Sequence, residues 1–132
     1  MMHEWVVGAA LPPLAFTVDG PSMKVLSLLM RDPNPIHFDP AFVHSIGLGD
    51  RPINQGTINM AYPINALLRV VDNPARLRRF SCRFQGRLVA GDRVVVTGAV
   101  RAVDDETVSV DVWLDHEAGG RVLTGSAVLT RR

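Results

Sequence analysis

Hydrophobic and polar residues alternate along the second half of the chain, from residue 76 to residue 130. Turns rich in Gly, Asp or Glu at residues 90–92, 104–106 and 117–120 divide this alternation into four segments. A period of two residues is typical of a β-strand with one buried face. Short turns join strands that are antiparallel neighbours. This half of the chain therefore predicts four consecutive strands in an antiparallel meander.

The first half of the chain predicts helices and loops. After an extended piece at residues 14–18, a helix runs to Arg31, with Ser22 or Asp19 as its N-cap. The segment 31–40 contains three prolines. Proline cannot continue a helix, and it also restricts the residue before it. The helix therefore ends at Arg31, and a stiff loop follows.

Further along, the pattern predicts a buried helix. A short helix over residues 41–46 ends at Gly47, and a longer helix begins near Gln55 and Gly56. Apolar residues occupy nearly all faces of the longer helix, so protein must surround it. We therefore predict an α+β fold in which a curved antiparallel sheet wraps around a central helix. The length fits one domain over residues 1–132.

Composition and charge narrow the class of protein. Of the 132 residues, 47% are hydrophobic and 20% are charged, which is typical of a globular protein. A net charge of +1 indicates no nucleic-acid or membrane partner. The chain has no apolar run long enough to span a bilayer and no signal-peptide pattern, so we expect a cytoplasmic protein.

Cysteine and most histidines are not expected to carry chemistry. Cys82 is the single cysteine, which excludes an internal disulfide, and its place on the apolar side of its strand predicts a buried side chain. His44 has His37 seven residues away and no cysteine nearby, so no metal site is predicted. His3 and His116 are expected at the surface.

Asp32 and His37 are the candidate catalytic residues. They lie five residues apart in a loop stiffened by Pro33 and Pro35, with Asn34 between them. A carboxylate and an imidazole that share one water form an acid/base pair, because one removes a proton and the other supplies one. Proline lowers the entropy cost of holding such a geometry. The alternative is that Asp32 and Asn34 are ordinary turn residues.

The start of the buried helix provides a second candidate feature. A helix N-terminus exposes unpaired backbone N–H groups and a partial positive charge. Gly56 allows a ligand to approach that backbone closely. The arrangement suits an oxyanion hole for a thioester carbonyl. The alternative is a packing or capping glycine.

Two ordered strings of residues carry a family resemblance. They read Arg-Asp-Pro-Asn-Pro-Ile-His-Phe-Asp-Pro-Ala-Phe at residues 31–42 and Arg-Pro-Ile-Asn-Gln-Gly at residues 51–56. Together they resemble the hydratase motif of the MaoC-like dehydratase family, which includes the R-specific enoyl-CoA hydratases. The order of the predicted elements also fits the hot-dog fold of that family over nearly the whole chain.

The resemblance implies an activity. The enzyme would hydrate trans-2-enoyl thioesters of coenzyme A or acyl carrier protein to (R)-3-hydroxyacyl thioesters, or dehydrate them in reverse. Asp32 and His37 would activate a water that adds at C3 and would return a proton to C2. The Gly56 N–H would hold the thioester oxygen, with Asn34 and Gln55 in support.

The resemblance also bears on cofactors and assembly. No metal or redox cofactor is implied, since coenzyme A or phosphopantetheine arrives as part of the substrate. The family further implies a homodimer or a heteromeric assembly with sites between protomers, and closing the sheet edges by dimerisation fits the physics of exposed strands.

Four further residues are expected to contact substrate. Asn59 and Tyr62 belong to the predicted buried helix, and we expect them to line a tunnel for the acyl chain. Arg79 and Arg83 share one strand face with Arg87, where they would contact phosphates of coenzyme A or an acidic carrier protein. The alternative for the arginines is a solvated sheet face.

Three positions depart from the family pattern. Arg31 stands where glycine is usual, Gln55 where histidine is frequent, and Ile64 where R-specific hydratases have serine eight residues after the glycine. These departures leave the acyl chain and the attacking nucleophile open.

Two other kinds of function also stay open. One is a thioesterase, or an enzyme that adds another nucleophile such as an amine to the enoyl thioester. The other is a helper subunit of a heteromeric dehydratase, against which the intact pair of Asp32 and His37 argues.

Overall fold

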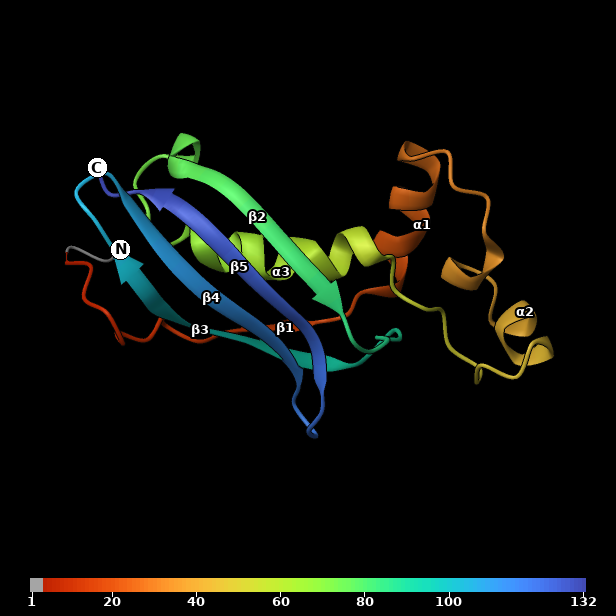
Figure 1. The fold of residues 1–132 in the computed structure, drawn as a ribbon. Coiled ribbons are helices and arrows are strands. Elements are labelled where there is room, and N and C mark those ends of the chain that lie inside the picture. The colour runs from red at the N-terminus through yellow and green to blue at the C-terminus, as the bar shows by residue number, and fades with distance from the viewer. Residues whose placement is uncertain (1–3) are drawn as a thin grey trace.

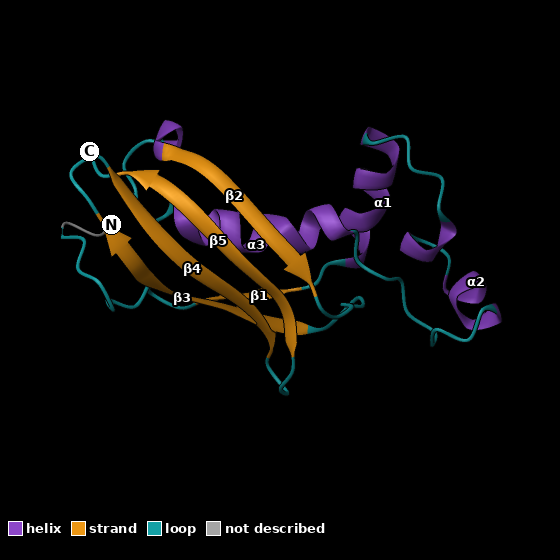
Figure 2. Ribbon diagram, viewed as in Figure 1, coloured by secondary structure: helices purple, strands orange, loops and turns teal. Residues whose placement is uncertain are grey.

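A curved antiparallel sheet wraps around one long helix in the computed structural model, which describes residues 4–132 (Figures 1 and 2). The helix is α3 (Gly56–Leu68), and the sheet order is β1-β3-β4-β5-β2. The strands are β1 (Leu14–Thr17), β2 (Leu77–Phe84), β3 (Arg93–Val103), β4 (Thr107–His116) and β5 (Arg121–Thr130). The predicted α+β fold is therefore confirmed.

The predicted meander is wrong in one connection. β3, β4 and β5 are successive antiparallel neighbours, but β2 pairs with β5 at the far edge of the sheet rather than with β3. β2 also ends at Phe84, although the predicted first segment continues to the turn at residues 90–92. Leu88 instead accepts a hydrogen bond from the Asn54 N–H (2.8 Å), and Val89 pairs with Ile53. Because residues 88–90 pair with the segment before α3, they cannot form a hairpin between β2 and β3.

The first half of the chain forms short helices that begin at aspartate or asparagine caps. Asp19 caps α1 (Gly20–Leu29) and accepts the Ser22 N–H at 3.1 Å, while Asp39 caps α2 (Pro40–Ser45). Two short 3₁₀ turns complete the helices, η1 (Pro35–His37) and η2 (Pro74–Arg76). Figure 1 shows α1 and α2 beyond the N-terminal end of α3, outside the curve of the sheet.

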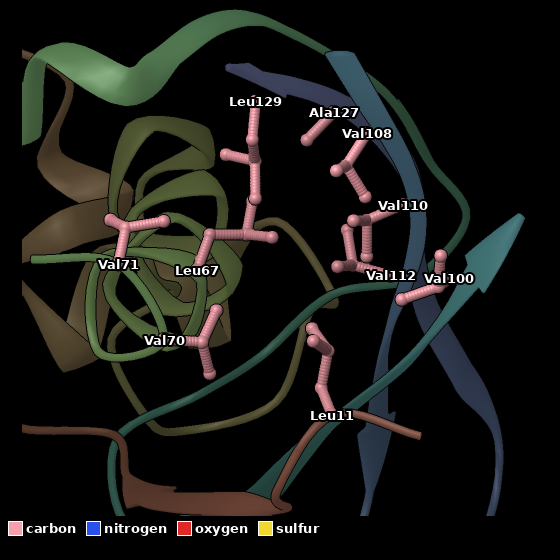
Figure 3. Packing of buried hydrophobic residues seen from close by; sticks show 10 residues of the cluster. All are labelled: Leu11, Leu67, Val70, Val71, Val100, Val108, Val110, Val112, Ala127 and Leu129. Carbon is pink, nitrogen blue, oxygen red and sulfur yellow. The ribbon is translucent and has the colours of Figure 1, made fainter. Parts of the chain in front are cut away.

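The core lies between α3 and the sheet in two clusters. In one cluster, Leu67 of α3 and the following Val70 and Val71 face valines of β3 and β4 (Figure 3). In the other cluster, Tyr62 packs with Met23 of α1. Burying these apolar groups stabilises the fold and joins α1 to the N-terminal half of α3.

The burial of several side chains differs from the burial that the sequence predicts. Cys82 is half-buried, and burial raises the pKa of its thiol, which agrees with a packing role. Phe84 has the parity of the inner face but is 51% exposed, because the edge strand ends there. His44 is exposed, His116 is half-buried with its Nε2 3.3 Å from Asp92 Oδ1, and His3 lies outside the described residues.

Candidate active site

The C-terminus of α1 positions Asp32. Arg31 follows the C-cap with φ = +52°, and its N–H donates to the Leu28 carbonyl (3.3 Å). The Asp32 N–H then donates to the Ser27 carbonyl (2.9 Å). This pair of bonds is a Schellman motif, whose left-handed position usually holds glycine. The motif gives a physical reason for glycine before this aspartate in the family, and Arg31 takes the same conformation at a cost of about 1–2 kcal/mol.

His37 is held by the segment that leads into α3. Asn34 Oδ1 accepts the Ile36 N–H (3.2 Å) and so caps η1, which carries His37. The Ile53 N–H donates to the Ile36 carbonyl (2.8 Å), and His37 Nδ1 lies 2.6 Å from the Ile53 carbonyl oxygen. A carbonyl only accepts hydrogen bonds, so Nδ1 carries the hydrogen. In the neutral form of the imidazole, Nε2 is then the nitrogen that accepts a hydrogen bond.

Asp32 and His37 converge as their spacing predicts. His37 Nε2 lies 3.4 Å from Asp32 Oδ2, while Asp32 Oδ1 accepts the Asn34 N–H at 3.1 Å. The His37 side chain is 9% exposed and the Asp32 side chain 35%, so a ligand reaches the pair from the Asp32 side. A water molecule has two O–H groups, and it can donate one to each of these acceptors. The arrangement can therefore hold and deprotonate a water.

Gly56 begins α3 three residues after Ile53, the residue that holds His37. No side chain caps α3 within residues 4–132, and the first N–H groups of a helix have no partner inside it. Gly56 is exposed, and the Phe84 ring lies 3.5 Å from the place of a Cβ at this position. The N–H groups at this end of α3 are thus available to a ligand, which is the geometry that an oxyanion hole needs.

A cavity of about 640 Å³ lies beside Asp32. Its lining comes from α1 and the following loop: Lys24, Ser27, Leu28, Arg31, Asp32, Pro33 and Phe38. Gly56 is not among these lining residues. The single chain thus places Asp32 and His37 together, whereas the role of Gly56 at the same cavity stays a prediction.

Gln55 is buried between the two helices. Its Nε2 donates to the Met23 carbonyl (2.9 Å) and to Ser27 Oγ (3.1 Å). Gln55 therefore ties the start of α3 to α1, and the Schellman motif that ends α1 positions Asp32. The predicted role of Gln55 in supporting an oxyanion hole at Gly56 stays a prediction.

Gln55→Met is expected to lower the free energy of unfolding by about 1–2 kcal/mol, because methionine leaves the Ser27 hydroxyl without its partner. Urea denaturation measures this change. Asn65→Met, at an exposed position of the same helix, serves as the control and should shift stability by less than about 0.5 kcal/mol. Equal effects of the two substitutions would contradict the bridging role of Gln55.

Asn59 and Tyr62 are buried in a polar cluster centred on Asn54. Asn54 Nδ2 lies 2.8 Å from Asn59 Oδ1 and 3.4 Å from the Tyr62 hydroxyl. Burial raises the pKa of Tyr62, so its phenol stays protonated at neutral pH. Nothing in the sequence pointed to Asn54 as the centre of this cluster, since asparagine before a helix is an ordinary cap residue. The predicted acyl tunnel along Asn59 and Tyr62 stays a prediction.

Arg79 and Arg83 lie exposed on the outer face of β2, opposite Val128 and Thr124 of β5. Within residues 4–132 neither arginine forms a salt bridge, and neither lines the cavity beside Asp32. Their predicted contact with substrate phosphates stays a prediction.

Two searches cover other kinds of site. In the described part of the chain, no three His, Cys, Asp or Glu side chains gather closely enough to hold a metal ion. No helix among residues 4–132 has the length and apolar character needed to cross a membrane.

The antiparallel sheet wrapped around α3 defines a hot-dog protein. The chain belongs to the family described as MaoC like domain, whose model matches residues 17–118. Among curated proteins, none matches the chain.

Solved structures share this fold. The R-hydratase PhaJ1 from Pseudomonas aeruginosa is 21% identical with a TM-score of 0.85, over 96% of this chain and 83% of that chain. The ChsH1–ChsH2 complex from Mycobacterium tuberculosis is 23% identical with a TM-score of 0.82, over 96% and 98%. The HadBC (3R-hydroxyacyl-ACP dehydratase) complex, also from Mycobacterium tuberculosis, is 18% identical with a TM-score of 0.74, over 98% and 99%.

Proposed function

We propose that this protein hydrates trans-2-enoyl thioesters to (R)-3-hydroxyacyl thioesters and catalyses the reverse dehydration. The observation that carries the proposal is the 3.4 Å approach of His37 Nε2 to Asp32 Oδ2, with Nδ1 held by the Ile53 carbonyl. Membership of the MaoC-like family supports the same reaction class. The names of two structural neighbours, an R-hydratase and a 3R-hydroxyacyl-ACP dehydratase, agree with it.

The proposed reaction uses one water. His37 Nε2 accepts one of its protons, while Asp32 Oδ2 accepts a hydrogen bond from the other O–H group. The water oxygen bonds to C3, and the electrons of the double bond move toward the thioester oxygen, which the Gly56 N–H stabilises. The imidazolium of His37 then returns the proton to C2. Because oxygen and proton arrive from the same side, the addition is syn.

The proposed reaction requires no metal ion and no redox cofactor. Coenzyme A or the phosphopantetheine of acyl carrier protein enters as part of the substrate. The helix N-terminus and the pair of side chains supply the polarisation and the proton transfer.

The test is a hydration assay with enoyl-CoA substrates of increasing chain length. The loss of the enoyl-thioester absorbance measures the reaction. We expect loss of absorbance without release of free thiol, and chiral analysis should find the (R)-3-hydroxyacyl product. Release of thiol without hydration would replace the proposal with a thioesterase. A protein inert alone but active with a partner subunit would favour the helper role.

We also propose that the chain acts as a dimer, with a second copy or a related subunit. Val25 and Leu29 of α1 are 56% and 76% exposed, and β2 leaves an open sheet edge. Exposed apolar groups and unpaired strand edges are commonly covered by association. Light scattering of the purified protein should give twice the chain mass, or the mass of a heteromer after co-expression. A fully active monomer would contradict this assembly.

A further inference from the structure

The cavity beside Asp32 has a cationic side that the proposed reaction does not use. Lys24, Ser27 and Leu28 follow the i, i+3, i+4 spacing of one face of α1, and Arg31 lies two residues after the helix ends at Leu29. Lys24 is the only lysine of the chain. Within residues 4–132, neither Lys24 nor Arg31 forms a salt bridge. Five arginines elsewhere do form them: Arg51, Arg76, Arg93, Arg101 and Arg121. The two cations at the cavity are therefore available to an anion.

Arg31 has a backbone conformation that residues with a side chain rarely adopt. Its φ of +52° lies in the left-handed region, where glycine is free of strain. Backbone strain of this kind tends to persist at functional sites, where the side chain is needed. Here the strained residue directly precedes the proposed catalytic carboxylate and lines the same cavity.

Apolar side chains line the cavity together with the two cations and Asp32. Lys24 lies on α1, five residues before the helix ends at Leu29, and Asp32 follows beyond the C-cap. Leu28 is 80% exposed and Phe38 is 36% exposed, and both line the cavity. A ligand that combines a reactive group, an apolar portion and an anionic group matches the residues that line the cavity.

We propose that Lys24 and Arg31 bind the phosphate end of the phosphopantetheine arm that carries the acyl group. This inference rests on the proposed function, since it names the carrier that the same site recognises. Lysine and arginine bind phosphate through charge-assisted hydrogen bonds. Leu28 and Phe38 contact the apolar part of the arm between the phosphate and the thioester.

The decisive variant is Lys24→Ala combined with Arg31→Gly. Glycine accepts the left-handed conformation and alanine suits the helix interior, so this double variant should fold and melt no lower than the wild type. Arg69→Ala with Arg132→Ala is the matched control, because it also removes two exposed cations that form no salt bridge in the described chain. Arg79→Ala with Arg83→Ala tests the rival cationic surface on β2.

Calorimetry measures the binding of coenzyme A and of unphosphorylated pantetheine without any turnover. The comparison shows whether the cations beside Asp32 or those on β2 bind the phosphate. The Lys24/Arg31 variant should bind coenzyme A about tenfold more weakly and pantetheine within about twofold of wild type, and the difference should shrink at high salt. Unchanged coenzyme A binding, or an equal loss for pantetheine, would overturn the inference. A tenfold loss in the Arg79/Arg83 variant alone would move the phosphate contact to β2.

Kinetics distinguish the two carriers and the two proposals. In the Lys24/Arg31 variant, a raised KM with nearly unchanged kcat for both crotonyl-CoA and crotonyl acyl carrier protein assigns the contact to the arm phosphate. A raised KM for crotonyl-CoA alone assigns it to phosphates that only coenzyme A has. A change in KM with neither substrate overturns the inference while the hydratase proposal stands. A wild-type protein that binds coenzyme A through these residues but hydrates nothing overturns the hydratase proposal instead.

Discussion

Asp32→Asn is expected to lower the kcat for hydration of crotonyl-CoA by a factor of about 10²–10⁴, the usual contribution of a positioned acid/base group. Asp32 Oδ1 accepts the Asn34 N–H, so the oxygen of an introduced amide keeps that place. The amide NH₂ then faces His37 Nε2, 3.4 Å away in the wild type, and donates to it. The substitution therefore removes a carboxylate and also occupies the nitrogen that accepts the proton of water.

The fold should survive this change, since asparagine has the size of aspartate and preserves the loop bond. Steady-state kinetics and a thermal melt of the same samples measure both properties. Asp50→Asn removes an exposed carboxylate from the loop after α2 and should leave kcat within about twofold. Wild-type rates in Asp32→Asn would contradict the assignment of the acid/base pair.

Gly56→Pro is expected to lower kcat by about 10²–10³, the usual effect of removing one oxyanion-hole donor. Proline has no N–H, and it is favoured at the first position of a helix, which Gly56 occupies. The preceding Gln55 has φ = −65° and ψ = 144°, a conformation compatible with a following proline. The variant should therefore fold while lacking the one group that the proposal requires at this place.

Gly56→Ala separates the lost N–H from added bulk. Its Cβ meets the Phe84 ring at 3.5 Å, an ordinary van der Waals contact, and its N–H remains. We expect Gly56→Ala to keep substantially more activity than Gly56→Pro at equal or higher stability. Equal kcat in the two variants would show that the Gly56 N–H does not stabilise the developing oxyanion.

Local features of the fold follow from short stretches of sequence. Asp19 caps α1 because its side chain needs only the N–H groups of the next turn. The alternation along β3, β4 and β5, with tight turns between them, suffices for two hairpins. The approach of Asp32 to His37 is equally local, since Asn34 and the prolines shape a loop of only six residues.

The alternation of hydrophobic and polar residues did not predict the contacts between distant segments. β2 alternates like its neighbours, yet it pairs with β5, because Leu88 and Val89 are engaged by the segment before α3. That same segment provides the Ile53 carbonyl that selects the tautomer of His37. Periodicity describes which side of a strand is apolar, and it carries no information on which backbone groups meet across the chain.

The same limit applies to the surroundings of the site. A motif places Gln55 beside Gly56, but the bonds of Gln55 to Met23 and Ser27 arise only when α1 packs against α3. Residue types near the loop thus suffice to predict that Asp32 and His37 converge, because that convergence depends on neighbours in sequence. The tautomer of the histidine, the bridge from α3 to α1 and the cationic cavity along α1 depend on how the helices and strands pack, which is a property of the folded chain.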